Sequence, residues 1–250
     1  MTIALFDVQC GFGGAAPGSR EPLSAAALLA EMDGAGVERA LARAVPAALE
    51  IDISWSNRHL FAACAGHPRL VPCPIVAPNS ARDLAPEHLQ LSEVISQGAG
   101  AVSIRPRQDT WSLAPWCCDR LFTAMQTRRL PVLCQLGELS YDDVAALAER
   151  YPTLPLVIIG ADYRSQRILL PLLEAFATIY LSIGSNYIVQ GGIEQCVETV
   201  GARRLLFGTG FPEVDMPAHI AQLMYADIAD DEKRLIGAGN LDRLLQGVQR

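Results

Sequence analysis

Short apolar runs alternate with amphipathic stretches along the chain. Several runs, such as Leu156–Ile159, are apolar at every position, which is typical of parallel strands buried on both faces. The stretches between the runs carry apolar residues at helical spacing. The runs that we interpret as strands are Ala4–Gln9, Arg39–Val45, Leu70–Ala77, Gly100–Pro106, Pro131–Gln135, Pro155–Gly160, Ile179–Gly184 and Arg204–Gly210.

Two of the predicted helices have clear start signals. Ser140 and Asp143 have the spacing of a capping box, and Asp215 precedes Met216-Pro217, a typical N-cap followed by a proline in the first turn. Strands that alternate with helices in this way predict one α/β domain over residues 1–250, a (β/α)8 TIM barrel. An open doubly wound sheet is the runner-up, but the glycines of Gly11–Gly14 have the wrong spacing for a dinucleotide-binding turn. The longer loop 11–22 is expected on the catalytic rim, as a lid or as an inert connection.

Composition narrows the class of partner. A net charge of -7 argues against nucleic acid and anionic membranes, whose phosphates would be repelled. No apolar run approaches the ~20 residues that span a bilayer. The start of the sequence lacks a basic, signal-like segment, and the cysteine count of seven is odd, so we expect reduced thiols and a cytoplasmic protein. Barrels often pair through their outer helices, which leaves a homo-oligomer open.

The order of several motifs resembles the metal-dependent amidohydrolases. Leu205–Pro212 resembles their strand-8 signature Phe-Gly-Thr-Asp-x-Pro, and Gly239–Leu245 resembles their terminal Gly-Asn-Ala-x-x-Leu-Leu helix. Further matches follow the family's order along the rest of the chain. They are Phe6–Gly13 for the opening Asp-x-His-x-His-x-Gly, Gly98–Pro106 for strand 4, Pro131–Gln135 for strand 5 and Leu154–Ala161 for strand 6.

This resemblance implies one or two divalent metals held by four histidines and an aspartate, which activate water for hydrolysis or assist decarboxylation. In this sequence the matching positions hold Gln9, Gly11, Gln135, about Ala161, and Gly210. Glycine and alanine offer no side-chain ligand, and a glutamine carbonyl does not replace imidazole for a transition metal. We therefore expect no metal and no other cofactor. Because all five positions change together, we interpret the result as a settled polar pocket.

Strand tips and the loops after them provide the remaining candidate residues. Hydrogen-bonding groups and arginines suit a small polar or anionic ligand. The expected substrate-binding residues are Asp7, Gln9, Arg105, Gln135, Tyr163, Arg164, Asn186 and Thr209.

Asp162 and Glu213 are the candidate proton-transfer residues. Each candidate also has a structural interpretation. Asp162 is as well suited to capping the helix expected from Tyr163, and Asp7 to being a buried carboxylate with backbone partners. Of the histidines, only His219 is expected near the rim, where a structural role is favoured. Alternation along the strands places Asp7, Gln9 and Gly11 on one face and turns Cys10 and Cys134 away.

Two functions remain open from the sequence. One is a hydrolase that acts without a bound metal on a small polar or carboxylate-bearing metabolite, with Arg105 or Arg164 binding the anion. The other is a non-catalytic small-molecule-binding or regulatory protein on the same barrel. Fold alone does not separate these functions.

Overall fold

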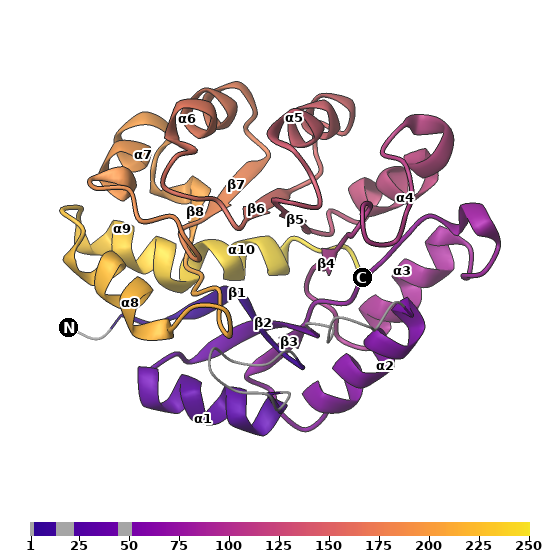
Figure 1. The fold of residues 1–250 in the computed structure, drawn as a ribbon, viewed down its shortest axis with the longest axis horizontal. Coiled ribbons are helices and arrows are strands. Elements are labelled where there is room, and N and C mark those ends of the chain that lie inside the picture. The colour runs from indigo at the N-terminus through magenta and orange to yellow at the C-terminus, as the bar shows by residue number, and fades with distance from the viewer. Residues whose placement is uncertain (1–2, 14–22, 45–51) are drawn as a thin grey trace.

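The computed structural model describes residues 3–13, 23–44 and 52–250 (Figure 1). All eight predicted strands form, most of them shorter than the apolar runs that predicted them. They are β1 (Phe6–Phe12), β2 (Arg39–Ala44), β3 (Leu70–Pro72), β4 (Val102–Ser103), β5 (Val132–Gln135), β6 (Leu156–Ile159), β7 (Ile179–Ser182) and β8 (Leu205–Leu206).

The strands pair in parallel and close on themselves. One sheet has the strand order β1-β2-β3, and the other has the order β4-β5-β6-β7-β8, so each strand pairs with the next one along the chain. An isolated bridge between Ile75 and Ser103 joins β3 to β4, and another between Cys10 and Phe211 joins β8 to β1. The fold is therefore a (β/α)8 barrel, and the open-sheet alternative is wrong.

Helices surround the barrel, and the last one crosses it (Figure 1). Leu241 and Leu244 of this helix pack among the barrel's interior residues. The helices are α1 (Ala25–Ala35), α2 (Ile53–Cys64), α3 (Glu87–Ser96), α4 (Pro115–Thr127), α5 (Tyr141–Arg150), α6 (Gln166–Ala175), α7 (Gly192–Val200), α8 (Met216–Tyr225), α9 (Asp230–Arg234) and α10 (Asn240–Gln246), with short helical turns η1 (Asn79–Ala81), η2 (Ala202–Arg204) and η3 (Leu235–Gly239).

The predicted helix starts can be compared directly. Ser140 and Asp143 form the capping box of α5. Helix α8 begins at Met216 as predicted, but the side chain of its N-cap Asp215 makes no capping hydrogen bond. Helix α6 begins at Gln166 rather than at Tyr163. Residues 14–22 of the predicted rim loop lie outside the described residues.

Buried apolar residues form two clusters, one on each side of the barrel wall. The inner cluster includes Leu41, Leu133 and Val157, and the larger outer cluster packs strands against helices and contains Cys10 and Cys134. Both cysteines thus point away from the interior, as alternation predicts. All seven cysteines are free thiols. None of the helices in the described segments is long and apolar enough to cross a membrane.

The expected alternation along β1 is interrupted. Phe6 and Val8 pack in the inner cluster, and the pairing register with β2 shifts between Asp7 and Cys10. Such a β-bulge places consecutive residues on one side of the strand. Val8 and Gln9 consequently both face inward, and the prediction that Asp7 shares the face of Gln9 is wrong.

Candidate active site

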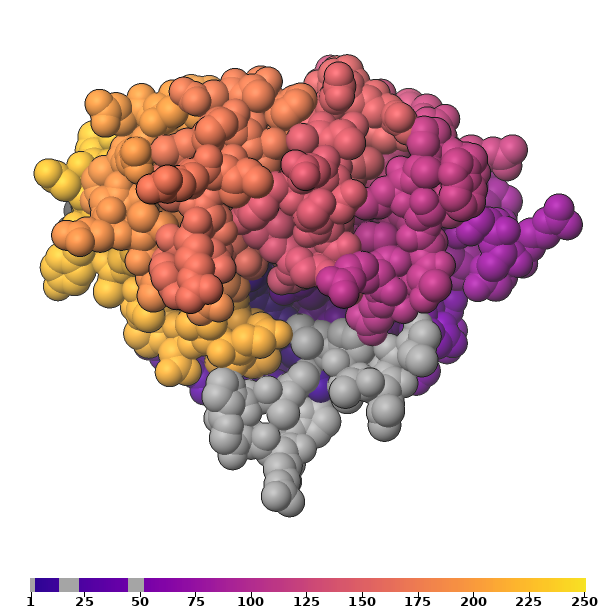
Figure 2. Space-filling view, turned by 45° about the horizontal axis from the view of Figure 1, so that its top comes forward, coloured from indigo at the N-terminus to yellow at the C-terminus, as the bar shows by residue number. Residues whose placement is uncertain are grey.

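A cavity of about 400 Å³ lies at the carboxyl ends of the strands. Figure 2 shows a hollow on this face, with indigo N-terminal residues deep inside it. Of the predicted site residues, the structure brings Gln9, Arg105, Gln135, Asn186 and Glu213 together here. The other polar lining residues are Arg43, Ser103, Gln108, Glu138 and Ser185.

Two glutamines form part of the cavity floor. Gln9, at the bulge of β1, accepts a hydrogen bond from the Ser182 hydroxyl at 3.0 Å, and its amide donates to the Ser185 hydroxyl. Gln135, the last residue of β5, accepts one from Arg43 Nη1 at 3.2 Å. These partners fix both amides, so the floor presents oriented neutral dipoles.

Arg105 follows β4 and is held by a carboxylate that the sequence did not identify. Its Nη2 lies 2.9 Å from Asp109 Oδ1, and its Nε lies 3.2 Å from Asp109 Oδ2. Burial raises the pKa of Asp109, and the charge of Arg105 opposes that shift. Arg105 itself is 8% exposed, and its Nη1 is buried with no hydrogen-bond partner among the described residues. Within the described residues, this N–H donor is therefore left unsatisfied in a residue that lines the cavity.

Two carboxylates line the cavity, and they differ in the hydrogen bonds that they accept. Glu138, after β5, accepts hydrogen bonds from the backbone N–H groups of Arg107 at 2.9 Å and Gln108 at 3.1 Å. Glu213, after β8, is exposed, and no hydrogen bond or ion pair holds it within the described structure. Glu213 is thus the carboxylate free to interact with a ligand or a water molecule.

Asp7 and Thr209 lie behind the cavity wall. Both are fully buried, and Asp7 accepts hydrogen bonds from the Thr209 hydroxyl at 2.5 Å and from the backbone N–H groups of Gln9 at 2.8 Å and Thr209 at 3.1 Å. Burial raises the pKa of Asp7, and these hydrogen bonds oppose that shift. The geometry is that of the structural carboxylate that the sequence left as an alternative.

Asp162, Tyr163 and Arg164 form a turn before α6, outside the residues that line the cavity. Asp162 accepts hydrogen bonds from the backbone N–H of Arg164 and the hydroxyl of Ser165, both at 2.8 Å, which lower its pKa. Tyr163 is 52% exposed, and its hydroxyl accepts a hydrogen bond from Arg164 Nε. His219, in the first turn of α8, is buried and does not line the cavity either.

Arg43 is the most informative residue that the sequence reasoning missed. It lies near the end of β2, two positions after Leu41, and apart from Arg39 at the start of the strand the other residues are apolar or small. Because a charged residue at the carboxyl end of a buried strand is unusual, this position gave a usable signal. Asp109, Glu138 and Ser185 lie in loops, and no local pattern indicated that they would converge.

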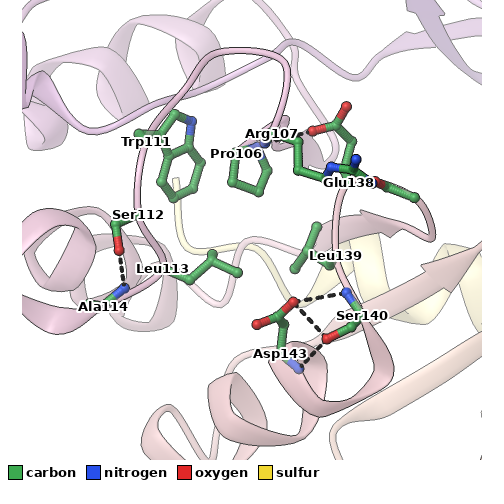
Figure 3. Close-up of a pocket in the computed structure, with 11 residues that line it drawn as sticks. Pro106, Arg107, Trp111, Ser112, Leu113, Ala114, Glu138, Leu139, Ser140 and Asp143 are labelled. Atoms are coloured by element: carbon green, nitrogen blue, oxygen red, sulfur yellow. Dashed lines mark hydrogen bonds between the residues drawn. The ribbon is translucent and has the colours of Figure 1, made fainter.

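A second hollow, of about 640 Å³, lies beside the cavity between the loops that lead to α4 and α5 (Figure 3). Glu138 lines both spaces. In Figure 3 the polar groups of Ser140 and Asp143 are joined to each other by the capping box, and Ser112 accepts from Ala114. Since helix capping already occupies these groups, the cavity at the strand ends is the better candidate active site.

Comparison with known proteins identifies the family. The amidohydrolase family model matches residues 12–246, and the chain therefore belongs to this family. No curated protein sequence matches.

Solved structures with the same fold cover almost the whole chain. An uncharacterized TIM-barrel protein from Bordetella bronchiseptica has a TM-score of 0.73 at 17% identity, covering 100% of both chains. A 5-carboxyvanillate decarboxylase from Sphingomonas paucimobilis has 0.72 at 12%, covering 98% of this chain and 99% of its own. A probable 2-pyrone-4,6-dicarboxylic acid hydrolase from Acinetobacter baumannii, with citric acid bound, has 0.70 at 14%, covering 98% and 100%. At these identities the similarity shows the fold alone.

The residues at the positions implied by the family do not fit a divalent metal. A Cβ atom added to Gly210 would lie 2.8 Å from the Oγ and 3.0 Å from the Cα of Ser185, at a φ of +80°. Ala161 packs in the outer cluster, and Gly160 lines the cavity instead, where a Cβ would lie 2.5 Å from Gln135 Nε2. A side chain at either position would therefore be strained by its positive φ, and at Gly210 it would also be crowded against Ser185. Among the described residues, no three His, Cys, Asp or Glu side chains form a group that could hold a metal ion.

Proposed function

We propose that this protein binds a small carboxylate-bearing metabolite in the cavity at the strand ends and hydrolyses it without a bound metal. The observation that carries this proposal is the buried Nη1 of Arg105, which has no partner in the described part of the chain, in a residue that lines a cavity with fixed amides. A buried guanidinium N–H without a partner costs free energy that a ligand carboxylate would recover. Asp109 holds the guanidinium in place, so the site is oriented before the ligand arrives.

Glu213 is the proposed general base. A water molecule that loses a proton to Glu213 attacks the carbonyl carbon, and the C–O or C–N bond to the leaving group then breaks. The leaving group takes the proton from Glu213, which completes hydrolysis without a change in oxidation state. Asp162, the other candidate, is held by two hydrogen bonds in a turn away from the cavity lining, which favours Glu213.

One observation favours the second candidate function, a non-catalytic binding protein. Glu213 is exposed, and no neighbour in the described structure orients its carboxylate. Hydrolysis by this route requires that the Glu213 carboxylate be oriented by the bound ligand, or by a movement of the protein around the ligand. Binding and turnover must therefore be measured separately.

Ligand binding is tested on protein treated with EDTA, by thermal shift against a panel of small carboxylates and lactones. A ligand present at 100 times its Kd stabilises the folded state by ~2.7 kcal/mol, a shift of several degrees for a chain of this size. We expect such a shift for the wild type, its loss in Arg105→Gln, and its retention in the matched control Arg164→Gln. If no carboxylate shifts the wild type, or if Arg105→Gln binds as well as the control, the proposal is wrong.

Turnover of the ligand then separates the two functions. Hydrolysis that falls at least ~100-fold in Glu213→Gln supports the enzyme, since general base catalysis contributes about 10²–10⁴-fold. Binding that depends on Arg105 but proceeds without turnover supports the non-catalytic protein instead.

A further inference from the structure

The second arginine of the cavity, Arg43, lies between two of the positions where the family resemblance places metal ligands. On the backbone it pairs with Gly11, which matches the second histidine. Through its side chain it donates a hydrogen bond to Gln135, which matches the third. Leu41, two residues earlier on β2, packs in the inner cluster, so Arg43 points into the barrel and lines the cavity.

The two arginines of the cavity differ in their acidic partners. Arg105 has an ion pair with Asp109, whereas no ion pair to Arg43 is found among the described residues. The Nε of Arg43 is buried and has no hydrogen-bond partner within residues 3–13, 23–44 and 52–250. The positive charge of Arg43 nevertheless reaches the buried interior, because it opposes the upward shift in the pKa values of Asp7 and Cys73. A half-buried guanidinium in a cavity of neutral amides, with one buried N–H donor unsatisfied, favours a ligand that brings negative charge to it.

We propose that the guanidinium of Arg43 binds the carbonyl oxygen of the substrate and stabilises the negative charge that this oxygen gains during hydrolysis. Arg43 thereby supplies the positive charge that a metal cation would bring to the same strand ends. In this proposal β2 contributes a catalytic residue. This inference rests on the proposed function, since it concerns the same cavity and reaction. The two arginines then bind different groups of the substrate. Arg105 binds the carboxylate that does not react, and Arg43 binds the carbonyl group that does.

This step requires no reactant other than the substrate and water. When the water oxygen attacks, the π electrons of the C=O bond move to the carbonyl oxygen, which becomes an oxyanion beside Arg43. The electrons return when the C=O bond forms again and the leaving group departs. An N–H donor that is already oriented and shielded from water stabilises such a charge without reorganisation. Gln135 holds Nη1 in place, and the remaining N–H groups of the guanidinium are the donors proposed for the oxyanion.

Two ligands of equal chain length separate the roles of the arginines. 4-Phosphonobutyrate carries a carboxylate and a tetrahedral phosphonate, which imitates the oxyanion. Glutaramate carries the same carboxylate and a neutral amide in place of the phosphonate. The affinity of each ligand is measured by calorimetry for the wild type, Arg43→Gln, Arg105→Gln and the exposed control Arg164→Gln.

We expect the wild type to bind phosphonobutyrate roughly 10- to 100-fold more tightly than glutaramate, the range that a hydrogen bond to a charged group gives. In Arg43→Gln this preference should fall to about one, while the affinity for glutaramate stays the same. In Arg105→Gln both ligands should bind more weakly and the preference should persist. Arg43→Met serves as a second variant if Arg43→Gln does not fold.

The failure of this inference and the failure of the proposed function give different results. If the wild type has no preference for the phosphonate, or if Arg43→Gln keeps the preference, Arg43 is not the oxyanion-binding group. In that case, weaker binding of both ligands by Arg105→Gln still supports the proposed function. If neither ligand binds the wild type, the proposed function and the inference fail together at this cavity.

Discussion

Replacing Gly210 with alanine measures how firmly the fold has closed the strand-8 ligand position. Gly210 has a φ of +80°, and an added Cβ would lie 2.8 Å from the Oγ, 3.0 Å from the Cα and 3.1 Å from the N of Ser185. The left-handed conformation costs a non-glycine residue ~1–2 kcal/mol. Crowding against the Ser185 hydroxyl and the backbone beside it adds ~1–3 kcal/mol. We therefore expect Gly210→Ala to lower the free energy of unfolding by roughly 2–5 kcal/mol.

Gly36→Ala is the matched control. Gly36 ends α1 with a φ of 76°, and a Cβ there would meet nothing within 4 Å. This variant should pay the conformational cost alone, ~1–2 kcal/mol. Urea unfolding followed by circular dichroism measures both variants. If Gly210→Ala is destabilised no more than Gly36→Ala, the space beside Ser185 is open and our steric reasoning is refuted.

The same position tests the metal directly. Gly210→Asp introduces the carboxylate that the family signature has at this point, but it meets the same contacts with Ser185. We expect this variant to be destabilised at least as much as Gly210→Ala and to bind no zinc in equilibrium dialysis. Stoichiometric zinc in Gly210→Asp would show that the ligand position can still be used.

Two further predictions concern buried polar groups. Burial raises the pKa of Asp7 above its ordinary value of 3.8, so the free energy of unfolding should fall as the pH rises from 3.8 through the folded-state pKa. Asp7→Asn should lack this fall when urea unfolding is measured between pH 4 and pH 7. If the wild type and the variant have parallel pH profiles, the raised pKa is wrongly assigned to Asp7. Asn240 donates hydrogen bonds from Nδ2 to the carbonyl oxygens of Ala202 and Leu205, both at 2.8 Å. Asn240→Ala should therefore lower the free energy of unfolding by ~2–3 kcal/mol. As a control, Gln246→Ala at an exposed position of the same helix should change it by less than ~0.5 kcal/mol.

Most of the barrel could be predicted because its information is local. Apolar runs such as Leu156–Ile159 mark buried parallel strands, and the order of strands and helices leaves few architectures. The Gly-Asn pattern near the end of the chain also has a physical reason. The buried amide of Asn240 ties α10 to the residues around β8, and α10 covers one end of the barrel interior.

The face of a strand residue could be predicted only where the alternation is regular. On β5, Leu133 and Gln135 face inward and Cys134 faces outward, as expected. On β1 the bulge shifts the alternation by one residue, which buries Asp7 behind the wall. A bulge depends on the pairing with the neighbouring strand, and a single sequence does not reveal it.

The loops account for most of the candidate site that was missed. Asp109 reaches back to Arg105 from the loop after β4, and Glu138 reaches the same cavity from the loop after β5. These contacts depend on how two loops fold over the strand ends. Arg43 is different, because its position in β2 was predicted and its charge was visible.

The central claim is that arginine, and not a divalent cation, provides the positive charge at the strand ends. The most direct test is elemental analysis of the protein, purified without chelator from cells grown with added zinc and manganese. The account predicts far less than one transition-metal ion per chain. One tightly held ion per chain, lost together with ligand binding when Gln9 and Gln135 are replaced by leucine, would contradict it.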